Sequence, residues 1–154
     1  MLSFRKATLA DTKLYFDWAN DQDVREQSYN SNVINFDNHK KWFKTKLDDV
    51  SCLMLLFQNE EKLNVGQVRI EKENEKEALI GISIAAEHRG KGYSKEMLQI
   101  ASDFFLASNS NCLINAFIKE RNLNSKFSFE KAGFKFKEMI NFENFKSFHY
   151  VKKV

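Results

Sequence analysis

Two of the five glycines in this 154-residue chain stand one residue apart, at Gly90 and Gly92. They lie in the stretch EHRGKGYSKEML, between an apolar run typical of a strand and a segment with the apolar period of a helix. Glycine adopts left-handed backbone conformations easily and lets a ligand approach the main chain. The amides of such a turn and the positive end of the following helix form a seat for a phosphate group. The turn therefore predicts a strand–turn–helix unit with an anion site.

Two familiar phosphate-binding patterns do not fit this turn. A P-loop needs four residues between its glycines, whereas a single residue separates Gly90 from Gly92. The dinucleotide fingerprint needs another glycine three residues after Gly92, where Lys95 stands. On the turn alone, a strand–helix junction without a ligand remains an alternative.

Composition argues against several classes of protein. Lys and Arg (24) nearly balance Asp and Glu (21), and no basic block indicates nucleic-acid binding. No apolar run approaches the roughly 18 residues that span a bilayer, and the N-terminus lacks the apolar region of a signal peptide. Cys52 and Cys112 lie in apolar runs and are expected to be buried thiols, and no zinc-ligand spacing is present. We expect a cytoplasmic protein that uses no metal, membrane or nucleic acid.

The apolar pattern predicts a single domain, residues 1–154, of the α/β (α+β) class. Strands are expected at 2–8, 52–57, 64–70, 78–85, 112–118, 134–140 and 147–151. Helices are expected after caps at Asp11 and Asp37, after Gly92 and over 124–131, with 20–35 as a loop or short helix. The residues expected to face inward from the second and third helices are Trp42, Phe43, Leu47, Met97, Leu98, Ala101, Phe104 and Phe105.

Two segments resemble motifs of the GNAT superfamily of acyl-CoA N-acyltransferases. ISIAAEHRGKGYSKEML resembles motif A, whose core Q/R-x-x-G-x-G/A falls on 89–94, with Ser94 in place of the final Gly or Ala. NLNSKFSFEKAGF, at 122–134, resembles motif B, and FRKATLAD, at 4–11, resembles the usual first strand and helix start. The resemblance implies the GNAT fold, a mixed, mostly antiparallel twisted sheet of about seven strands with a V-shaped splay and about four flanking helices.

The same resemblance implies that acetyl-CoA is the co-substrate. Pantetheine would lie in the V-shaped gap and pair with the backbone of 82–84, while amides of 89–94 would hold the pyrophosphate. The expected cofactor-binding residues are Ile82, Ser83, Ile84, Arg89, Gly90, Lys91, Gly92, Tyr93, Ser94, Asn122, Ser125 and Phe129.

The implied reaction is direct attack of a primary amine on the thioester. It needs a neutral amine, a polarised carbonyl and a proton for the departing thiolate. Phe129 stands where motif B often has a proton-donating Tyr, and Phe117 stands where many protein N-terminal acetyltransferases have a Glu base. The candidate catalytic groups that remain, each with a structural alternative, are Ser128, Tyr93, Tyr150, Glu71 and His39, besides water.

The acceptor is indicated by residues 15–47. Their sequence resembles the pattern W-x-N-D…V-R…S…I…H-x-x-W-F of GNAT enzymes that act on nucleotide-linked amino sugars of the pseudaminic-acid-pathway type. Aromatic rings stack on sugars or bases, Asn and Ser bond hydroxyls, and Arg binds diphosphate. The expected function is acetylation of the 4-amino group of such a sugar, with these substrate-binding residues: Trp18, Asn20, Arg25, Ser28, His39 and Trp42. For each Trp the alternative is a core position in an amphipathic helix.

Two other functions stay open. Protein N-terminal (ribosomal-protein-type) acetyltransferases share a similar W-x-N start, although Phe117 counts against that activity. A non-catalytic, CoA-binding regulatory domain is the alternative of another class, motivated by Phe117 and Phe129. The Phe-rich stretch FENFKSFHYV, at 142–151, is expected to support the edge of a homodimer.

Overall fold

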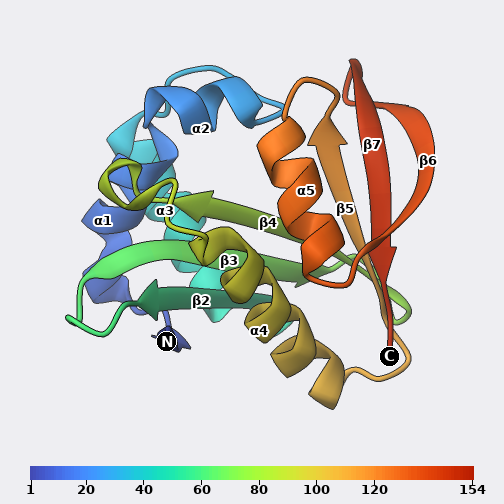
Figure 1. The fold of residues 1–154 in the computed structure, drawn as a ribbon. Coiled ribbons are helices and arrows are strands. Elements are labelled where there is room, and N and C mark those ends of the chain that lie inside the picture. The colour runs from blue at the N-terminus through green and yellow to red at the C-terminus, as the bar shows by residue number, and fades with distance from the viewer.

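A computed structural model describes residues 1–154 as a seven-stranded sheet with helices on both faces (Figure 1). The spatial order of the strands is β1-β2-β3-β4-β5-β7-β6, and every neighbouring pair is antiparallel except β4 and β5. The strands are β1 (Ser3–Lys6), β2 (Cys52–Gln58), β3 (Asn64–Lys72), β4 (Glu77–Ile84), β5 (Leu113–Lys119), β6 (Lys135–Phe142) and β7 (Phe145–Lys152).

Five helices flank the sheet, with short 3-10 turns at Leu9–Asp11 and Ala86–His88. The helices are α1 (Thr12–Ala19), α2 (Gln22–Gln27), α3 (Phe36–Asp48), α4 (Tyr93–Ser108) and α5 (Leu123–Lys131). The polar segment after α1 thus contains the short helix α2, one of the two forms expected for it. None of the helices has both the length and the apolar composition needed to cross a bilayer.

The parallel strands β4 and β5 separate soon after they begin. They pair only from Glu77 opposite Leu113 to Leu79 opposite Asn115. Beyond that point β4 stays with β3 and β5 stays with β7, and Figure 1 shows the two strands diverging. The expected V-shaped splay is confirmed.

The backbone of β4 faces this gap with free polar groups. The Leu113 amide donates to the Lys76 carbonyl and the Ala85 amide donates to the Val65 carbonyl, each at 2.8 Å. Because backbone groups alternate along a strand, the even-numbered residues of β4 direct theirs toward β5. Ile82 therefore presents its N–H and C=O groups to the gap where β5 has diverged. Ile84 presents its N–H group there, while its carbonyl accepts from Arg89 Nε.

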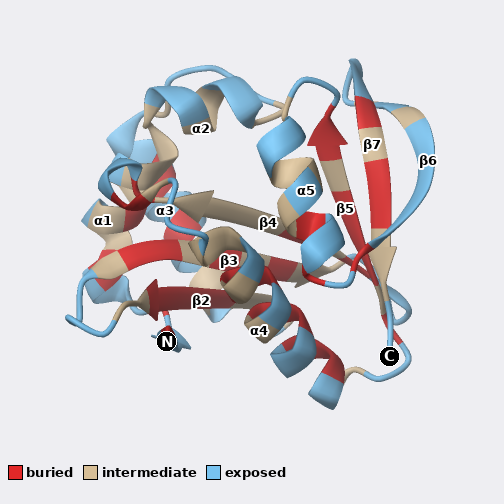
Figure 2. Ribbon diagram, in the orientation of Figure 1, coloured by how far each residue is buried: buried red, intermediate tan, exposed pale blue.

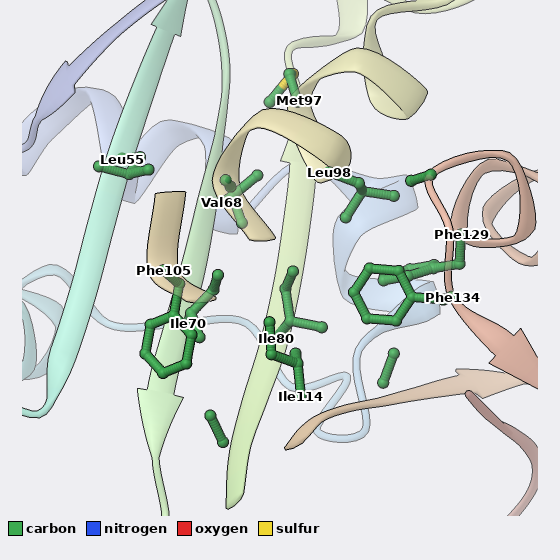
Figure 3. Close-up of a cluster of buried hydrophobic side chains, with 14 of the residues drawn as sticks. Leu55, Val68, Ile70, Ile80, Met97, Leu98, Phe105, Ile114, Phe129 and Phe134 are labelled. Atoms are coloured by element: carbon green, nitrogen blue, oxygen red, sulfur yellow. The ribbon is translucent and has the colours of Figure 1, made fainter. Parts of the chain in front are cut away.

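The larger of two hydrophobic cores lies between the sheet, α4 and α5 (Figure 3). The helical period of α4 places Met97, Leu98 and Phe105 against the sheet, as expected. Phe104 does not join them and is 43% exposed. Its ring packs edge-on against Phe4, at 5.2 Å between centroids. Because β1 is an edge strand of only four residues, it leaves one side of that ring in solvent.

The smaller core packs α1 and α3 against β2 on the other face of the sheet. Its buried residues are Ala7, Tyr15, Phe43, Met54 and Leu56. Trp42 was expected to face inward, but it is 38% exposed. Since successive residues of a helix point about 100° apart, Phe43 takes the inward position and Trp42 lies at the rim.

Two polar details of the N-terminal half also differ from expectation. Asn35, rather than Asp37, caps α3, because its side chain accepts from the Asn38 amide. Asp11 precedes α1 as expected, but its carboxylate binds Arg5 and the Thr8 amide instead of capping that helix. Cys52 is half-buried, whereas Cys112 is buried as predicted, and both thiols are free. Figure 2 shows that buried residues concentrate on the sheet and on the inner side of α4.

Candidate active site

The glycine turn between β4 and α4 has the backbone conformation that the sequence predicts. Gly90 and Gly92 have φ values of +76° and +79°, and Gly92 caps α4. A Cβ built on either glycine meets no atom within 4 Å. The glycines are therefore required by the left-handed backbone and not by crowding within the chain.

Several amides at this turn have no acceptor. Those of Gly90, Lys91 and Gly92 donate to no group of the protein, and the first-turn amides of α4 lack intrahelical acceptors. The Arg89 amide points elsewhere, toward the Ala86 carbonyl at 3.4 Å. Free amides at the start of a 16-residue helix form an anion site. The amides available to a pyrophosphate are therefore those of residues 90–94, and the Arg89 amide is removed from the expected set 89–94.

The Arg89 side chain joins the turn to α2. Its Nε donates to the Ile84 carbonyl at 3.1 Å. The remaining guanidinium nitrogens bind Asp21 at 2.7 Å and Asp23 at 3.1 Å. Arg89 therefore links α2 to the glycine turn.

The second half of α5 lies beside the start of α4, because Ser128 of α5 contacts Ser94 of α4. The Asn122 Oδ1 accepts from the Ser125 amide at 3.2 Å, while Asn122 Nδ2 makes no hydrogen bond within the chain. The hydroxyls of Ser94 and Ser128 are 2.7 Å apart, and Ser128 donates to the Asn124 carbonyl. The residues predicted from the two motifs are thus brought together at one end of the gap.

Two aromatic residues that were predicted to act at the site, Phe129 and Tyr150, are buried in the larger core. Phe129 is buried in the larger core and packs edge-on against Phe134. Tyr150 is buried as well, and its hydroxyl donates to Glu130 at 2.6 Å. Burial and this hydrogen bond raise the pKa of Tyr150, so the phenol stays protonated at neutral pH. Tyr93 begins α4, with its ring 6.4 Å from that of His88.

Two catalytic candidates are engaged by the helices on the other face. Glu71 forms an ion pair with Lys46 of α3. His39 is buried, stacks on Phe43, and places Nε2 3.1 Å from the Thr12 carbonyl. Burial lowers the pKa of His39, so its imidazole is neutral at neutral pH. The structure brings neither side chain to the glycine turn.

Three of the residues expected to bind the acceptor hold the segment between α1 and α3. The Asn20 amide group bonds both the N–H and the C=O of Ile34, each at 2.8 Å. Arg25 donates to the carbonyls of Asn30 and Asn32. Ser28 donates to the Val24 carbonyl. These side chains hold the segment between α1 and α3 in place through hydrogen bonds within the chain.

A cavity of about 300 Å³ opens between α1 and the end of β4. Trp18 lines it, together with the carboxylate residues Asp17, Asp21 and Glu87. The other lining residues are Leu14, Ile84, Ala85, Ala86 and Arg89. Trp18 therefore lies where a ligand can reach it, next to the strand that borders the gap.

The sheet face under α3 carries a cation that the sequence reading missed. Arg69 of β3 lies opposite Gly81 of β4, where an added Cβ would meet nothing within 4 Å. Its guanidinium lies 5.0 Å from the centre of the exposed Trp42 ring. Arg5 and Arg89 have carboxylate partners, whereas Arg69 has none. The available signal was a charged residue inside the otherwise buried run VGQVRI. Beside it, Gln67 donates to Ser83 Oγ at 2.9 Å.

A diverging parallel pair, followed by a glycine turn with free amides, defines an acyl-CoA-binding transferase fold. Residues 1–135 match the family described as acetyltransferase (GNAT) domain, and the chain belongs to that family. It is therefore an acetyltransferase domain whose co-substrate is acetyl-CoA. No individual curated protein sequence matches the chain.

Solved structures share the whole fold. A spermidine N-acetyltransferase from Vibrio cholerae, crystallised with CoA and spermine, aligns with a TM-score of 0.87 and 18% identity, over 98% of this chain and 94% of that one. An aminoglycoside acetyltransferase, AAC(6')-Ib, crystallised with coenzyme A and kanamycin, aligns with a TM-score of 0.84 and 14% identity, over 99% and 95%. At these identities the likeness establishes the shared fold.

Proposed function

We propose that this domain transfers the acetyl group of acetyl-CoA to the primary amine of a nucleotide-linked amino sugar, at a 4-amino group. The observation that carries the proposal is the unpaired Arg69 beside the exposed ring of Trp42 and the open floor at Gly81. This site lies across β4 from the gap, on the face of the sheet that Gly81 leaves open. An acceptor with a phosphate group and an aromatic base can place the phosphate on Arg69 and the base on Trp42.

The donor half of the reaction uses the main chain. The free amides at 90–94 suit a pyrophosphate, and the free N–H groups of Ile82 and Ile84 suit pantetheine and the thioester oxygen. Because α4 and the large core fill one face of the sheet, the amine approaches from the face that carries Arg69 and Ser83.

The acceptor half needs side chains. A guanidinium binds phosphate oxygens bidentately, and an exposed indole offers a flat surface to a base or sugar. Arg25, the cation first expected to meet the diphosphate, donates from its two terminal guanidinium nitrogens to Asn30, Asn32 and Ser28. We therefore assign the binding of the diphosphate to Arg69, whose guanidinium has no carboxylate partner.

A second candidate is a cationic amine with more than one amino group. The cavity beside Trp18 carries Asp17, Asp21 and Glu87, which attract ammonium groups. The two neighbouring structures named above contain such compounds, spermine and kanamycin. Asp21 is already paired with Arg89, and Asp17 with Lys13, so much of this negative charge is neutralised within the chain.

An acceptor screen with two opposed variants separates the candidates. Release of CoA thiol is measured with a UDP-linked 4-amino-4,6-dideoxy sugar, spermidine, kanamycin and a peptide with a free N-terminus. We expect turnover on the nucleotide sugar, weakened by Arg69→Met and unaffected by Asp17→Asn. Turnover on spermidine or kanamycin that falls in Asp17→Asn and survives Arg69→Met supports the second candidate instead. Turnover on the peptide alone supports N-terminal acetylation, and acetyl-CoA binding without any turnover supports a regulatory domain.

Three broader expectations stay predictions, namely one domain over 1–154, a cytoplasmic location and a homodimer. For the homodimer, β6 is an edge strand and carries two exposed apolar side chains, Phe136 and Met139. Sedimentation of the purified protein measures the oligomeric state directly.

A further inference from the structure

The gap between β4 and β5 has an open end. The last pair of the two strands is Leu79 with Asn115, and from there β4 runs on to Ile84 and β5 to Lys119 without bonds to each other. The larger core joins the two strands on one face of the sheet. On the opposite face, Figure 1 shows the short helix α2 lying across the open end.

The first turn of α2 is anchored to the β4 side. Asp21 and Asp23 bind the guanidinium of Arg89 at 2.7 and 3.1 Å. Arg89 Nε donates to the carbonyl of Ile84, the last residue of β4, at 3.1 Å. Asp21 is also the N-cap of α2 and accepts from the Val24 amide. A single guanidinium therefore joins the start of α2 to the end of β4.

The last turn of α2 is anchored to the β5 side by a buried lysine. Lys119, the last residue of β5, is 7% exposed, and its Nζ donates to the Glu26 carbonyl at 2.9 Å. Carbonyl groups in the last turn of a helix have no amide partner within that helix, and they attract cations. Nζ also lies 3.9 Å from the centre of the Phe145 ring. Lys119 therefore joins the end of α2 to the end of β5.

The ammonium group of Lys119 has no carboxylate partner. Burial lowers the pKa of Lys119, and the nearby Arg121 lowers it further. A buried cation without a counter-ion costs stability. The stability of the fold does not explain this residue, whereas its hydrogen bond to α2 gives it a role.

The segment after α2 also reaches the β5 side. The hydroxyl of Tyr29 is 2.7 Å from Ser147 Oγ. Ser147 donates its own proton to the Phe145 carbonyl, so Tyr29 is the donor of this bond. The Tyr29 ring packs edge-on against Phe142 at 4.8 Å between centroids. Because Ser147 lies opposite Lys119 in the sheet, both contacts meet the same end of the β5–β7 pair.

We propose that α2 is a bridge that fixes the spacing of β4 and β5 at the open end of the gap, and that its anchors Arg89 and Lys119 are positioning residues for the acceptor. Asp21 and Arg89 line the cavity beside Trp18, next to Ile84 and its free amide. The amine must reach the thioester beside that strand. A bridge released at either end lets the two strands move apart and misplaces the acceptor, whichever amine is acetylated.

Spin labels on the two sides of the open end test the bridge without any ligand. Glu87 follows β4, Glu120 follows β5, and both are exposed. Each is replaced by cysteine and labelled in a Cys52→Ala, Cys112→Ala background, and electron paramagnetic resonance measures the distance between the labels. We expect one narrow distance distribution when the bridge is intact.

Two variants release the bridge at opposite ends. Asp21→Ser with Asp23→Ala removes both ion pairs of Arg89 and leaves α2 a residue that caps helices well. Lys119→Met removes the anchor on the β5 side. Each should broaden the distance distribution and shift it to longer distances. Their combination should add little, because a bridge released at one end no longer holds the other.

Asp48→Asn is the matched control, because it breaks an exposed ion pair with Lys44 on α3 and should leave the distance distribution unchanged. An unchanged distribution in either release variant overturns the bridge. Shifts that add up in the combined variant overturn it as well, since they indicate two independent local contacts.

Thermal unfolding separates a bridge from an ordinary stabilising contact. Lys119→Met should unfold at the wild-type temperature or above it, because it removes an unpaired buried charge. A lower melting temperature with an unchanged distance distribution makes Lys119 a structural residue and overturns its role as an anchor.

Kinetics measure the consequence for the reaction, with the UDP-linked 4-amino sugar and spermidine as acceptors in parallel. In both release variants the KM for the acceptor should rise about 10-fold, because the acceptor is no longer held in place. The Kd for acetyl-CoA should stay close to the wild-type value, since the amides of 90–94 and the edge of β4 remain. An unchanged KM for the acceptor in a variant whose distance distribution has shifted overturns the positioning role.

These outcomes are distinct from those of the proposed acceptor. If the wild type acetylates spermidine and not the nucleotide sugar, the acceptor proposal fails. The same rise in KM is then expected with spermidine, and the distance measurements, which use no acceptor, are unaffected.

Discussion

The two sides of the V-shaped gap recognise their ligands with different parts of the chain. On the donor side, the amides at 90–94 and the edge of β4 offer main-chain groups. On the proposed acceptor side, Arg69 of β3 and Trp42 of α3 offer side chains from two separate elements. The donor side therefore depends on backbone conformation, and the acceptor side depends on which side chains the fold brings together.

This difference follows from what each side must recognise. A main-chain site for a pyrophosphate constrains the backbone, and positive φ values favour glycine at the turn. Such a constraint is local and leaves a short motif. A side-chain site is assembled across strands and helices, and the spacing of its residues in the sequence carries no sign of their proximity.

Gly92→Glu should have the largest effect on the donor side. The new side chain would sit at a φ of +79° and bring a carboxylate toward the pyrophosphate. Like charges at an interface cost several kcal/mol, so the Kd for acetyl-CoA should rise at least about 100-fold. Isothermal titration calorimetry measures this directly.

Gly133→Glu is the matched control, because it introduces the same residue at a positive φ of +97° beyond the end of α5. It should lower stability by about 1–3 kcal/mol and keep the affinity for acetyl-CoA. Unchanged affinity in a folded Gly92→Glu protein would show that the turn does not bind the cofactor.

Arg69→Met should have the next largest effect, confined to the acceptor side. Methionine keeps much of the apolar stem and removes the donors, so the KM for the nucleotide sugar should rise about 10-fold, the value of roughly one charged hydrogen bond. The kcat at saturation and the affinity for acetyl-CoA should stay near the wild-type values. Steady-state kinetics with varied sugar measures both constants.

Lys76→Met, in the exposed β3–β4 turn, controls for the loss of a surface cation. A fall in kcat without a change in KM would place Arg69 in the chemical step and contradict its role in binding the acceptor.

The sequence predicted the backbone geometry of the donor side well because its determinants are local. The strand, the turn at Gly90 and Gly92, and the helix that follows are continuous in the sequence, over residues 77–108, and their pattern, with that of 122–134, also indicated the family. The fold followed from that identification, including the splay of β4 from β5.

The acceptor side was predicted less completely because its contacts are not local. Arg69 meets Trp42 only through the packing of α3 on the sheet. Trp42 was expected either in the core or at the acceptor, because a helical period does not fix which of two adjacent aromatic residues lies at the rim.

Asp11→Asn should have a moderate effect, on stability alone. Asp11 supports the junction of β1 and α1 through two hydrogen bonds from Arg5 and one from the Thr8 amide. Because the Arg5 side chain is 44% exposed, we expect a loss of about 1 kcal/mol in the free energy of unfolding at neutral pH. Urea denaturation followed by circular dichroism measures the loss.

The effect of Asp11→Asn should depend on pH in a defined direction. The hydrogen bonds from Arg5 lower the pKa of Asp11. The stabilisation is therefore complete above the unfolded pKa of about 3.9 and disappears as the pH falls through the lower folded value. A difference between the two proteins that stays constant down to the lowest pH at which both fold would contradict this linkage.

Ser128→Ala should have the smallest effect, even though Ser128 lies at the motif that defines the donor side. Its hydroxyl donates to the Asn124 carbonyl and is 2.7 Å from the Ser94 hydroxyl, so its proton is already used within the chain. We expect kcat to stay within about threefold of the wild type, because a committed hydroxyl contributes little to proton transfer. If Ser128→Ala instead lowers kcat by about 100-fold, then thiolate protonation depends on a donor-side side chain, and the division between a main-chain donor side and a side-chain acceptor side is incomplete.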